Sequence, residues 1–160
     1  MPDRVSALAP GDGDAMAQTG RVLAIDYGRA RIGLALSDPG RILASALETI
    51  QWNGVDRTWA DARILELCRQ YAVNLILVGL PRRSDGRPGE MESEARAFAD
   101  ALREQSGLPL VLQDERYTSV MAGRILQEAG RKKARRRAVI DQVAAELILQ
   151  SYLDQRRAVL

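Results

Sequence analysis

Apolar residues form short runs that are either continuous or alternating. Their spacing predicts most of the secondary structure. Residues 22–25 are continuously apolar, which is typical of a strand buried on both faces. From residue 32 to residue 37, bulky and small side chains alternate with a period of two, which predicts a second strand. An Asp-Pro-Gly turn follows at 38–40, and residues 41–46 can return as a third strand, which gives an antiparallel meander.

The rest of the chain alternates between helical and strand-like patterns. The run N-L-I-L-V-G-L at residues 74–80 is the most strand-like and predicts a central parallel strand. Helices are expected over residues 56–72, from about residue 90, over 118–129 and over 138–154, with a strand over 108–113. The order predicts an α/β fold with a mixed five-stranded sheet. Its three antiparallel strands come first, then helices and strands alternate, with helices on both faces.

Composition restricts the class of protein. The 160 residues suit one domain, and no apolar run approaches the length of a membrane span. Residues 1–20 lack periodicity and are expected to be a disordered tail, which leaves a domain over residues 21–155. The single cysteine, Cys68, falls in the apolar stripe of its helix and is expected to be a structural core residue. A lone cysteine also favours a reducing compartment.

The chain has no histidine, so any catalysis must use other side chains. This excludes histidine-based acid–base chemistry and the common histidine-containing zinc sites. Carboxylates instead follow two of the expected strands, at Asp26 and at Asp114-Glu115. Ligands gather outside the carboxyl ends of parallel strands, so we expect these acids to converge there.

A third acid comes from the last helix. Helical spacing predicts its buried stripe, which consists of Ile140, Val143, Ala144, Leu147 and Ile148. Asp141 falls at the flank of this stripe, close to the expected strand ends. Three carboxylates without histidine form a hard oxygen site that suits Mg²⁺ or Mn²⁺, and two such ions would serve phosphodiester cleavage.

Each acid also has an ordinary structural interpretation. Asp26 could cap its turn, Asp114 and Glu115 could pair with nearby arginines, and Asp141 could complement a helix dipole. These three interpretations are independent, whereas a metal site explains all three positions together.

Basic residues gather in the loops expected at the same end of the sheet. The strongest feature is the run at 131–137, expected to be a loop before the last helix, and a solvated loop is the alternative to phosphate binding. The candidates for nucleic-acid binding are Arg29, Arg31, Arg83, Arg116, Arg131, Lys132, Lys133, Arg135, Arg136 and Arg137. Three aromatic residues, Tyr27, Trp52 and Tyr117, are expected in loops where they could stack on bases.

Four motifs in order carry a resemblance to a known family. They are Asp26-Tyr27-Gly28 with Ile32-Gly33-Leu34-Ala35, Val78-Gly79-Leu80-Pro81 with Asp85-Gly86, Asp114-Glu115-Arg116-Tyr117-Thr118-Ser119, and Asp141 with Ala144-Ala145 and Ile148-Leu149-Gln150. Together they resemble the YqgF (RuvX) family of Holliday junction resolvases, also described as pre-ribosomal RNA nucleases. The resemblance covers residues 21–153.

The resemblance implies a ribonuclease H-like fold and a cytoplasmic, metal-dependent nuclease. Its substrate would be the 5′ end of the small-subunit ribosomal RNA precursor, or a Holliday junction. Asp26, Asp114, Glu115 and Asp141 match the family's acidic motifs and are the expected catalytic residues. Either Asp114 or Glu115 could bind the metal. With Glu115 favoured, the expected ligands of a two-metal Mg²⁺ or Mn²⁺ site are Asp26, Glu115 and Asp141. The chain departs from the family pattern at Arg83, where asparagine is common, and at Gln142, where serine is common.

Two other functions are compatible with the same residues. One is a phosphate-handling ATPase or sugar kinase, a group that shares this fold but normally needs two such domains. The other is a non-catalytic nucleic-acid-binding factor in ribosome assembly. RNA or DNA, a pre-ribosomal particle and a homodimer remain open as partners, and no membrane partner is expected.

Overall fold

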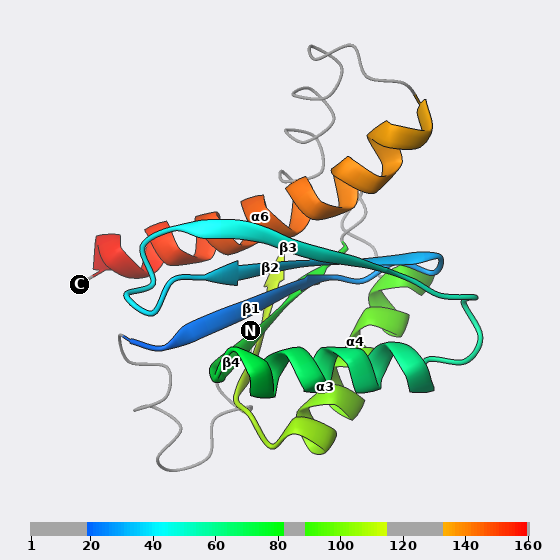
Figure 1. The fold of residues 1–160 in the computed structure, drawn as a ribbon, viewed down its shortest axis with the longest axis horizontal. Helices are drawn as coiled ribbons and strands as arrows, with labels where there is room; N and C mark the ends of the chain where they lie inside the picture. Colours follow the sequence, from blue (N-terminus) through cyan, green and yellow to red (C-terminus); the bar gives the residue numbers. More distant parts are fainter. Residues whose placement is uncertain (1–18, 82–88, 115–132, 160) are drawn as a thin grey trace.

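One five-stranded sheet organises the fold, with helices on both of its faces (Figure 1). The computed structural model describes residues 19–81, 89–114 and 133–159, and the side chains of the last helix from residue 143 to residue 157. The strands are β1 (Arg21–Asp26), β2 (Arg31–Ser37), β3 (Ala44–Gln51), β4 (Val73–Leu80) and β5 (Leu110–Asp114). They lie in the order β3-β2-β1-β4-β5.

The sheet is antiparallel at one side and parallel at the other. β1 pairs antiparallel with β2, and β2 pairs antiparallel with β3. β4 lies parallel to both β1 and β5. The mixed sheet expected from the sequence is therefore confirmed. As a result β1, β4 and β5 all end at the same edge of the sheet, where β2 begins.

The third strand begins later than its apolar pattern indicates, at Ala44 instead of residue 41. The Oδ1 atom of Asp38 accepts hydrogen bonds from the backbone N–H groups of Ile42 and Leu43, at 2.7 and 2.9 Å. Asp38 therefore closes a turn that occupies the first residues expected in the strand. Arg41 lies in this turn with a φ of 59°, and its buried side chain donates a hydrogen bond to the Gly20 carbonyl at 2.8 Å. Gly20 is thereby held against the domain.

Three helices of the described part of the chain cover the sheet. α3 (Thr58–Gln70) and α4 (Glu90–Ser106) lie on one face, and α6 (Lys133–Val159) lies on the other (Figure 1). α6 begins at Lys133 instead of residue 138, so residues 133–137 are helical, and the expectation of a loop there was wrong. Alanine, lysine and arginine are good helix formers, which the charge pattern had obscured. The helix expected over 118–129 lies outside the described residues. No described helix is long and apolar enough to cross a membrane.

Side chains alternate between two hydrophobic clusters, one on each face of the sheet. On β1, Leu23 and Ile25 pack toward α3 and α4, whereas Val22 and Ala24 pack toward α6. Cys68 is buried in the first cluster, where burial raises the pKa of its thiol to about 11, so its structural role is confirmed.

The buried stripe of α6 is rotated slightly from the expected one. Its buried residues are Ala144, Ala145, Ile148, Leu149, Tyr152 and Leu153. Val143 and Leu147, expected in the stripe, are only half-buried. The centre of the stripe therefore runs through Ala145 and Ile148.

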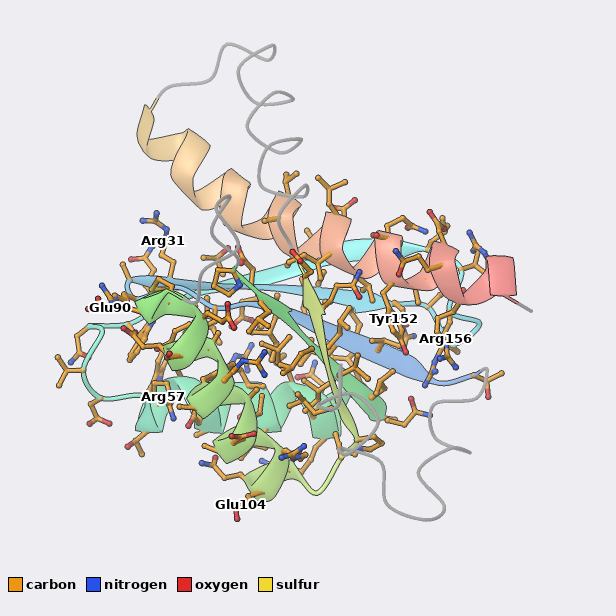
Figure 2. All side chains as sticks on the ribbon, turned by 180° about the vertical axis from the view of Figure 1, so that it is seen from behind. Arg31, Arg57, Glu90, Glu104, Tyr152 and Arg156 are labelled. Carbon is orange, nitrogen blue, oxygen red and sulfur yellow. The ribbon has the colours of Figure 1, made fainter. Side chains whose placement is uncertain are left out.

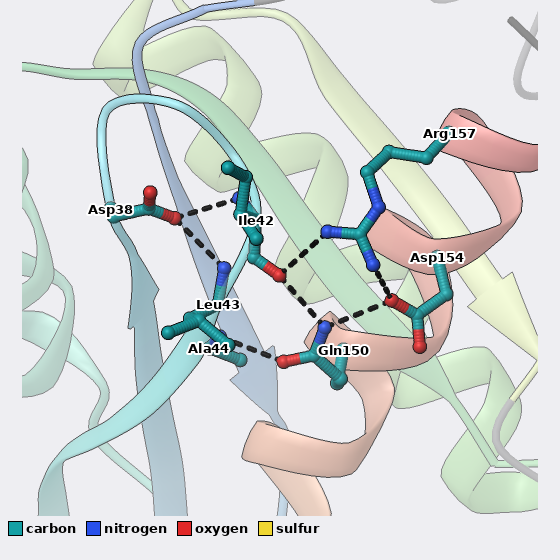
Figure 3. Close-up of polar contacts among 7 residues, drawn as sticks. All are labelled: Asp38, Ile42, Leu43, Ala44, Gln150, Asp154 and Arg157. Carbon is teal, nitrogen blue, oxygen red and sulfur yellow. Dashed lines mark hydrogen bonds and ion pairs between the residues drawn. The ribbon is translucent and has the colours of Figure 1, made fainter.

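Polar contacts fix α6 along the sheet (Figure 3). The Gln150 amide accepts a hydrogen bond from the Ala44 N–H and donates one to the Ile42 carbonyl, both at 2.9 Å. Arg157 donates a second bond to the same carbonyl at 3.0 Å. These bonds hold the second half of α6 beside the β2–β3 turn, so its first half extends toward the edge where β1 ends.

Candidate active site

The row of residues at the carboxyl end of β1 is polar on the α6 face. In the preceding row, Ala24, Ala35 and Leu77 are apolar and pack under α6. One step further, Asp26 pairs with Gly33 on β2 and with Gly79 on β4. Alternation along each strand places all three on the α6 face.

The same row continues onto the outer strands. Gly33 pairs with Thr49 on β3, and Gly79 pairs with Gln113 on β5. The polar row therefore reads Thr49, Gly33, Asp26, Gly79, Gln113 across the sheet. Asp26 is half-buried at its centre, and both of its neighbours lack a side chain. Within this row, therefore, no side chain stands directly beside the Asp26 carboxylate.

Asp114, by contrast, lies on the other face. Leu110 and Leu112 pack in the α3/α4 cluster, whereas Val111 packs under α6. The alternation places Asp114 with the first pair, and its side chain is exposed at the end of β5. Asp26 and Asp114 therefore share an edge of the sheet but not a face. Glu115 lies outside the described residues.

The third predicted acid, Asp141, belongs to α6, and its side chain lies outside the described ones. Position 141 precedes Ala145 by one helical turn and Ile148 by two, so it falls on the stripe that faces the sheet. The described side chains contain no group of three or more potential metal ligands. Of the predicted ligands, only Asp26 is described in full.

The α3/α4 face of the same edge is filled with aromatic side chains. Tyr27 follows Asp26 and is 5% exposed, with its ring centroid 4.8 Å from that of Phe98 and 5.9 Å from that of Trp52. The Arg57 guanidinium lies 5.3 Å from the Phe98 centroid, close enough for a cation–π contact. Burial, followed by the charge of Glu94, raises the pKa of Tyr27. Tyr27 is thus a core residue, and the expectation that it stacks on bases was wrong.

The turn between β1 and β2 is held by Trp52. The indole N–H of Trp52 donates to the Gly28 carbonyl at 2.7 Å, and its backbone N–H donates to the Ala30 carbonyl at 3.0 Å. A Cβ atom on Gly28 would lie 2.5 Å from the Arg31 carbonyl oxygen, so the turn needs glycine there. Trp52 therefore holds the turn after Asp26, and its side chain is half-buried.

Arg29 in this turn is paired with carboxylates. It donates from Nε to Glu94 at 2.8 Å, and its Nη2 contacts both Glu94 and, at 3.2 Å, Glu90. The bond to Arg29 lowers the pKa of Glu94, and the two glutamates raise the pKa of Arg29. Both glutamates belong to α4, and Glu90 lies in its first turn, where it also complements the helix dipole. The sequence pattern predicted the charge of Arg29 but not these partners.

The other predicted basic residues are only partly described. Arg31 begins β2 at the same end of the molecule as Glu90 and Arg57 (Figure 2). Four more candidates belong to the first two turns of α6: Lys133, Arg135, Arg136 and Arg137. The first turn of α6 contains no acidic residue. The side chains of these four residues lie outside the described ones. The candidates outside the described residues are Arg83, Arg116, Arg131 and Lys132, together with the aromatic Tyr117.

Comparison with known proteins identifies the family. A family model described as "RuvX: Holliday junction resolvase" matches residues 20–155. The chain belongs to this RuvX family. A RuvX relative from Roseiflexus sp. (strain RS-1), named "Putative pre-16S rRNA nuclease", is 46% identical over 88% of the chain and 98% of its own length. A relative of the same name from Mycolicibacterium smegmatis is 43% identical over the whole chain and 91% of its own length. The predicted family and the predicted activity class, a nuclease, are confirmed.

Solved structures share the fold of this RuvX chain. RuvC of T. thermophilus, in complex with a Holliday junction substrate, superimposes with a TM-score of 0.52 at 18% identity, over 86% of the chain and 96% of RuvC. The yeast mitochondrial Holliday junction resolvase Ydc2 gives 0.50 at 13% identity, over 91% of the chain and 83% of Ydc2. The ribonuclease H-like fold is thereby confirmed.

Two features of the site were not recognised from the sequence. The first is the pair of glycines beside Asp26, although glycine inside a strand often marks a close approach of another molecule. The second is the support of the turn by Trp52 and α4. Only strand register and tertiary packing bring these residues to Asp26.

Proposed function

We propose that this RuvX chain is a metal-dependent endonuclease whose Mg²⁺ or Mn²⁺ ligands are Asp26, Glu115 and Asp141. The observation that supports this most strongly is the position of Asp26. It lies half-buried in the centre of the polar row, where parallel strands end and both neighbouring positions of the row are glycine. A carboxylate oxygen at this place suits a hard cation such as Mg²⁺.

Glu115 is preferred to Asp114 as the second ligand because of the strand alternation. Asp114 occupies the α3/α4 face, opposite to that of Asp26. In an extended chain, the residue after Asp114 faces the α6 side. Asp114 is therefore assigned no contact with the proposed metal.

The level of Asp141 along α6 supports its role as the third ligand. Gln150 contacts Ala44 at the start of β3, and Ala44 pairs with Ser37, whose hydroxyl accepts a bond from the Val22 N–H at 2.8 Å. From Gln150 back to position 141, the helix axis advances about 14 Å. From Val22 to Asp26, β1 advances about 13 Å. Position 141 therefore falls near the level of the polar row.

When bound, two such ions would activate a water molecule and stabilise the leaving oxygen of a phosphodiester. The chain's own residues bind and orient the substrate. The basic residues at the start of α6 place positive charge at the positive end of a helix dipole, an arrangement that is unfavourable by itself. The phosphates of a nucleic acid would relieve it, so this region is the proposed backbone-binding surface.

The proposed substrate is the precursor of 16S ribosomal RNA, processed at its 5′ end in the cytoplasm, within or beside a pre-ribosomal particle. Support comes from the relatives that are more than 40% identical, which are named for this substrate. A Holliday junction would require two active sites and hence a dimer, whereas single-strand processing would not.

The test is cleavage of a 16S precursor fragment and of a four-way DNA junction by the parent, Asp26→Asn and Asp141→Asn. Each reaction is run with Mg²⁺ or Mn²⁺ and with excess chelator. We expect RNA cleavage by the parent only, lost on chelation, while Asp114→Asn stays active as the matched control. Equal activity in all variants would refute the metal site, and junction cleavage by a dimeric species would refute the RNA assignment.

A further inference from the structure

The polar row is asymmetric about Asp26. On the Gly33 side, β2 and β3 are covered by α6, which packs chiefly on β3, β2 and β1. On the Gly79 side, β4 and β5 have far less contact with α6. Among the described residues, the surface from Asp26 to Gln113 is therefore the less covered half of the row.

Backbone conformation does not explain the glycine at position 79. The described glycines with positive φ are Gly20, Gly54 and Gly107, and Gly79 is not one of them. It lies within β4, paired on one side with Asp26 and on the other with Gln113. Glycine weakens a strand, so an alanine would be favoured there unless the space above the backbone is needed.

Gln113 lies beyond Gly79 in the row, on the side away from Asp26. Two strand spacings separate it from Asp26, which is about 10 Å. The side chain is half-buried and makes no hydrogen bond to any described residue. Its two N–H donors make this amide suited to an anionic oxygen of a bound molecule.

We propose that Gly79 and Gln113 form a binding strip for the sugar–phosphate backbone of the substrate, with Gln113 donating a hydrogen bond to a phosphate oxygen. This inference rests on the proposed metal site at Asp26. Gly79 allows the backbone to lie against the sheet beside the carboxylate. Gln113 then sets the position of the strand relative to Asp26, and both residues determine which substrates fit.

The first test is Gly79→Ala in the full chain. Because alanine suits a strand, we expect the variant to unfold at the parent temperature or above. Its kcat/KM should fall by about tenfold or more, since displacing the reacting group by 1 Å can cost a hundredfold. A stable Gly79→Ala variant with the parent kcat and KM would overturn the proposal. So would a melting temperature that falls in proportion to activity, because that result indicates helix packing as the reason for the glycine.

The second test uses Gln113→Leu and Gln113→Glu. Binding of a fluorescent 16S precursor fragment is measured by anisotropy in the cleavage-deficient Asp26→Asn background. We expect Gln113→Leu to weaken binding about tenfold, the effect of one hydrogen bond to a charged group. Gln113→Glu should weaken it further, and this additional loss should shrink as salt rises. Parent-like binding by both variants would overturn the proposal.

Thr49→Val is the matched control. Thr49 occupies the other end of the polar row at the same separation from Asp26, on the half that α6 covers, and its buried hydroxyl has no hydrogen-bond partner among the described residues. Its variant should bind and cleave as the parent does. If Asp26→Asn remains active, the proposed metal site fails. If Asp26→Asn is inactive while Gly79→Ala and both Gln113 variants match the parent, only the binding strip fails.

Discussion

The two faces of the sheet differ sharply at the edge where β1 ends. On the α3/α4 face, the aromatic rings of Tyr27, Trp52 and Phe98 fill the space behind the turn. On the α6 face, Asp26 lies between two glycines, in a row with little side-chain volume. Two consecutive residues, Asp26 and Tyr27, thus face opposite environments.

This difference gives the two faces different roles. One face supports the proposed site, and the other carries the carboxylate proposed to react. A site must be held by residues whose own conformations are fixed by packing and hydrogen bonds. The filled face supplies that rigidity. The α6 face, here called the open face because the described neighbours of Asp26 in its row are glycines, carries the carboxylate proposed to react. Substitutions on the filled face should therefore act mainly on stability, and those on the open face mainly on activity.

The largest effect is expected from Phe98→Ala on the filled face. Phe98 is fully buried and contacts both Tyr27 and Arg57. Its removal should lower the free energy of unfolding by about 3–5 kcal/mol, through lost burial and the cavity left behind. Denaturant titration measures this, with Phe98→Leu as the milder control. A loss below 1 kcal/mol, about the cost of an average substitution, would contradict the supporting role.

Asp26→Asn on the open face should give the converse result. Activity should fall by more than about a hundredfold, because the loss of an outer-shell partner already costs up to that much. The free energy of unfolding should stay within about 0.5 kcal/mol of the parent, since the change is isosteric and removes a charge from a half-buried position. Single-turnover cleavage and denaturant titration measure the two quantities. A large loss of stability would show that Asp26 acts mainly in stabilising the fold and not in the reaction.

Trp52→Phe tests the link between the two faces. It keeps a ring beside Tyr27 but removes the donor to the Gly28 carbonyl. We expect a loss of about 1–3 kcal/mol in stability, the cost of leaving a partly buried acceptor without its partner. A smaller fall in kcat with KM unchanged should accompany it, because the turn after Asp26 is loosened. Unchanged stability and kcat would show that the indole bond does not hold the turn.

The smallest effect is expected from Glu94→Gln, which weakens the pair with Arg29. The folded pKa of Glu94 lies below its usual 4.5, chiefly through its bond with Arg29. The pair therefore stabilises the fold above pH 4.5, and this contribution is lost as pH falls through the lower folded pKa. Because both side chains are substantially exposed, it should amount to less than about 1 kcal/mol.

The difference in stability between parent and Glu94→Gln, followed from pH 7 downward, measures this contribution. It should vanish at low pH and shrink in high salt, where exposed pairs are screened. A difference that grows as the pH falls would have the wrong sign and would rule the pair out as its cause.

The local pattern of the chain determined the strands, most helices and the identity of the candidate acids. Period-two alternation in β2 and the unbroken apolar run of β4 are local signals, so they could be interpreted without partners. The absence of histidine likewise restricted the chemistry to oxygen ligands. The predicted ends of strands and helices were less accurate where polar or charged side chains determine the local structure and the apolar pattern does not show it. This happened at the turn closed by Asp38 and at the charged start of α6.

Only the tertiary structure decided which residues accompany Asp26. Register across four strands (β2, β1, β4 and β5) brings Gly33, Gly79 and Gln113 into one row with Asp26. Alternation in β5 places Asp114 on the other face. Tyr27 and Trp52, predicted to stack on bases, instead pack behind the turn after Asp26 and hold it. Packing also pairs Arg29 with Glu94 of α4. Strand register depends on contacts between segments distant in sequence, so no local pattern contains it.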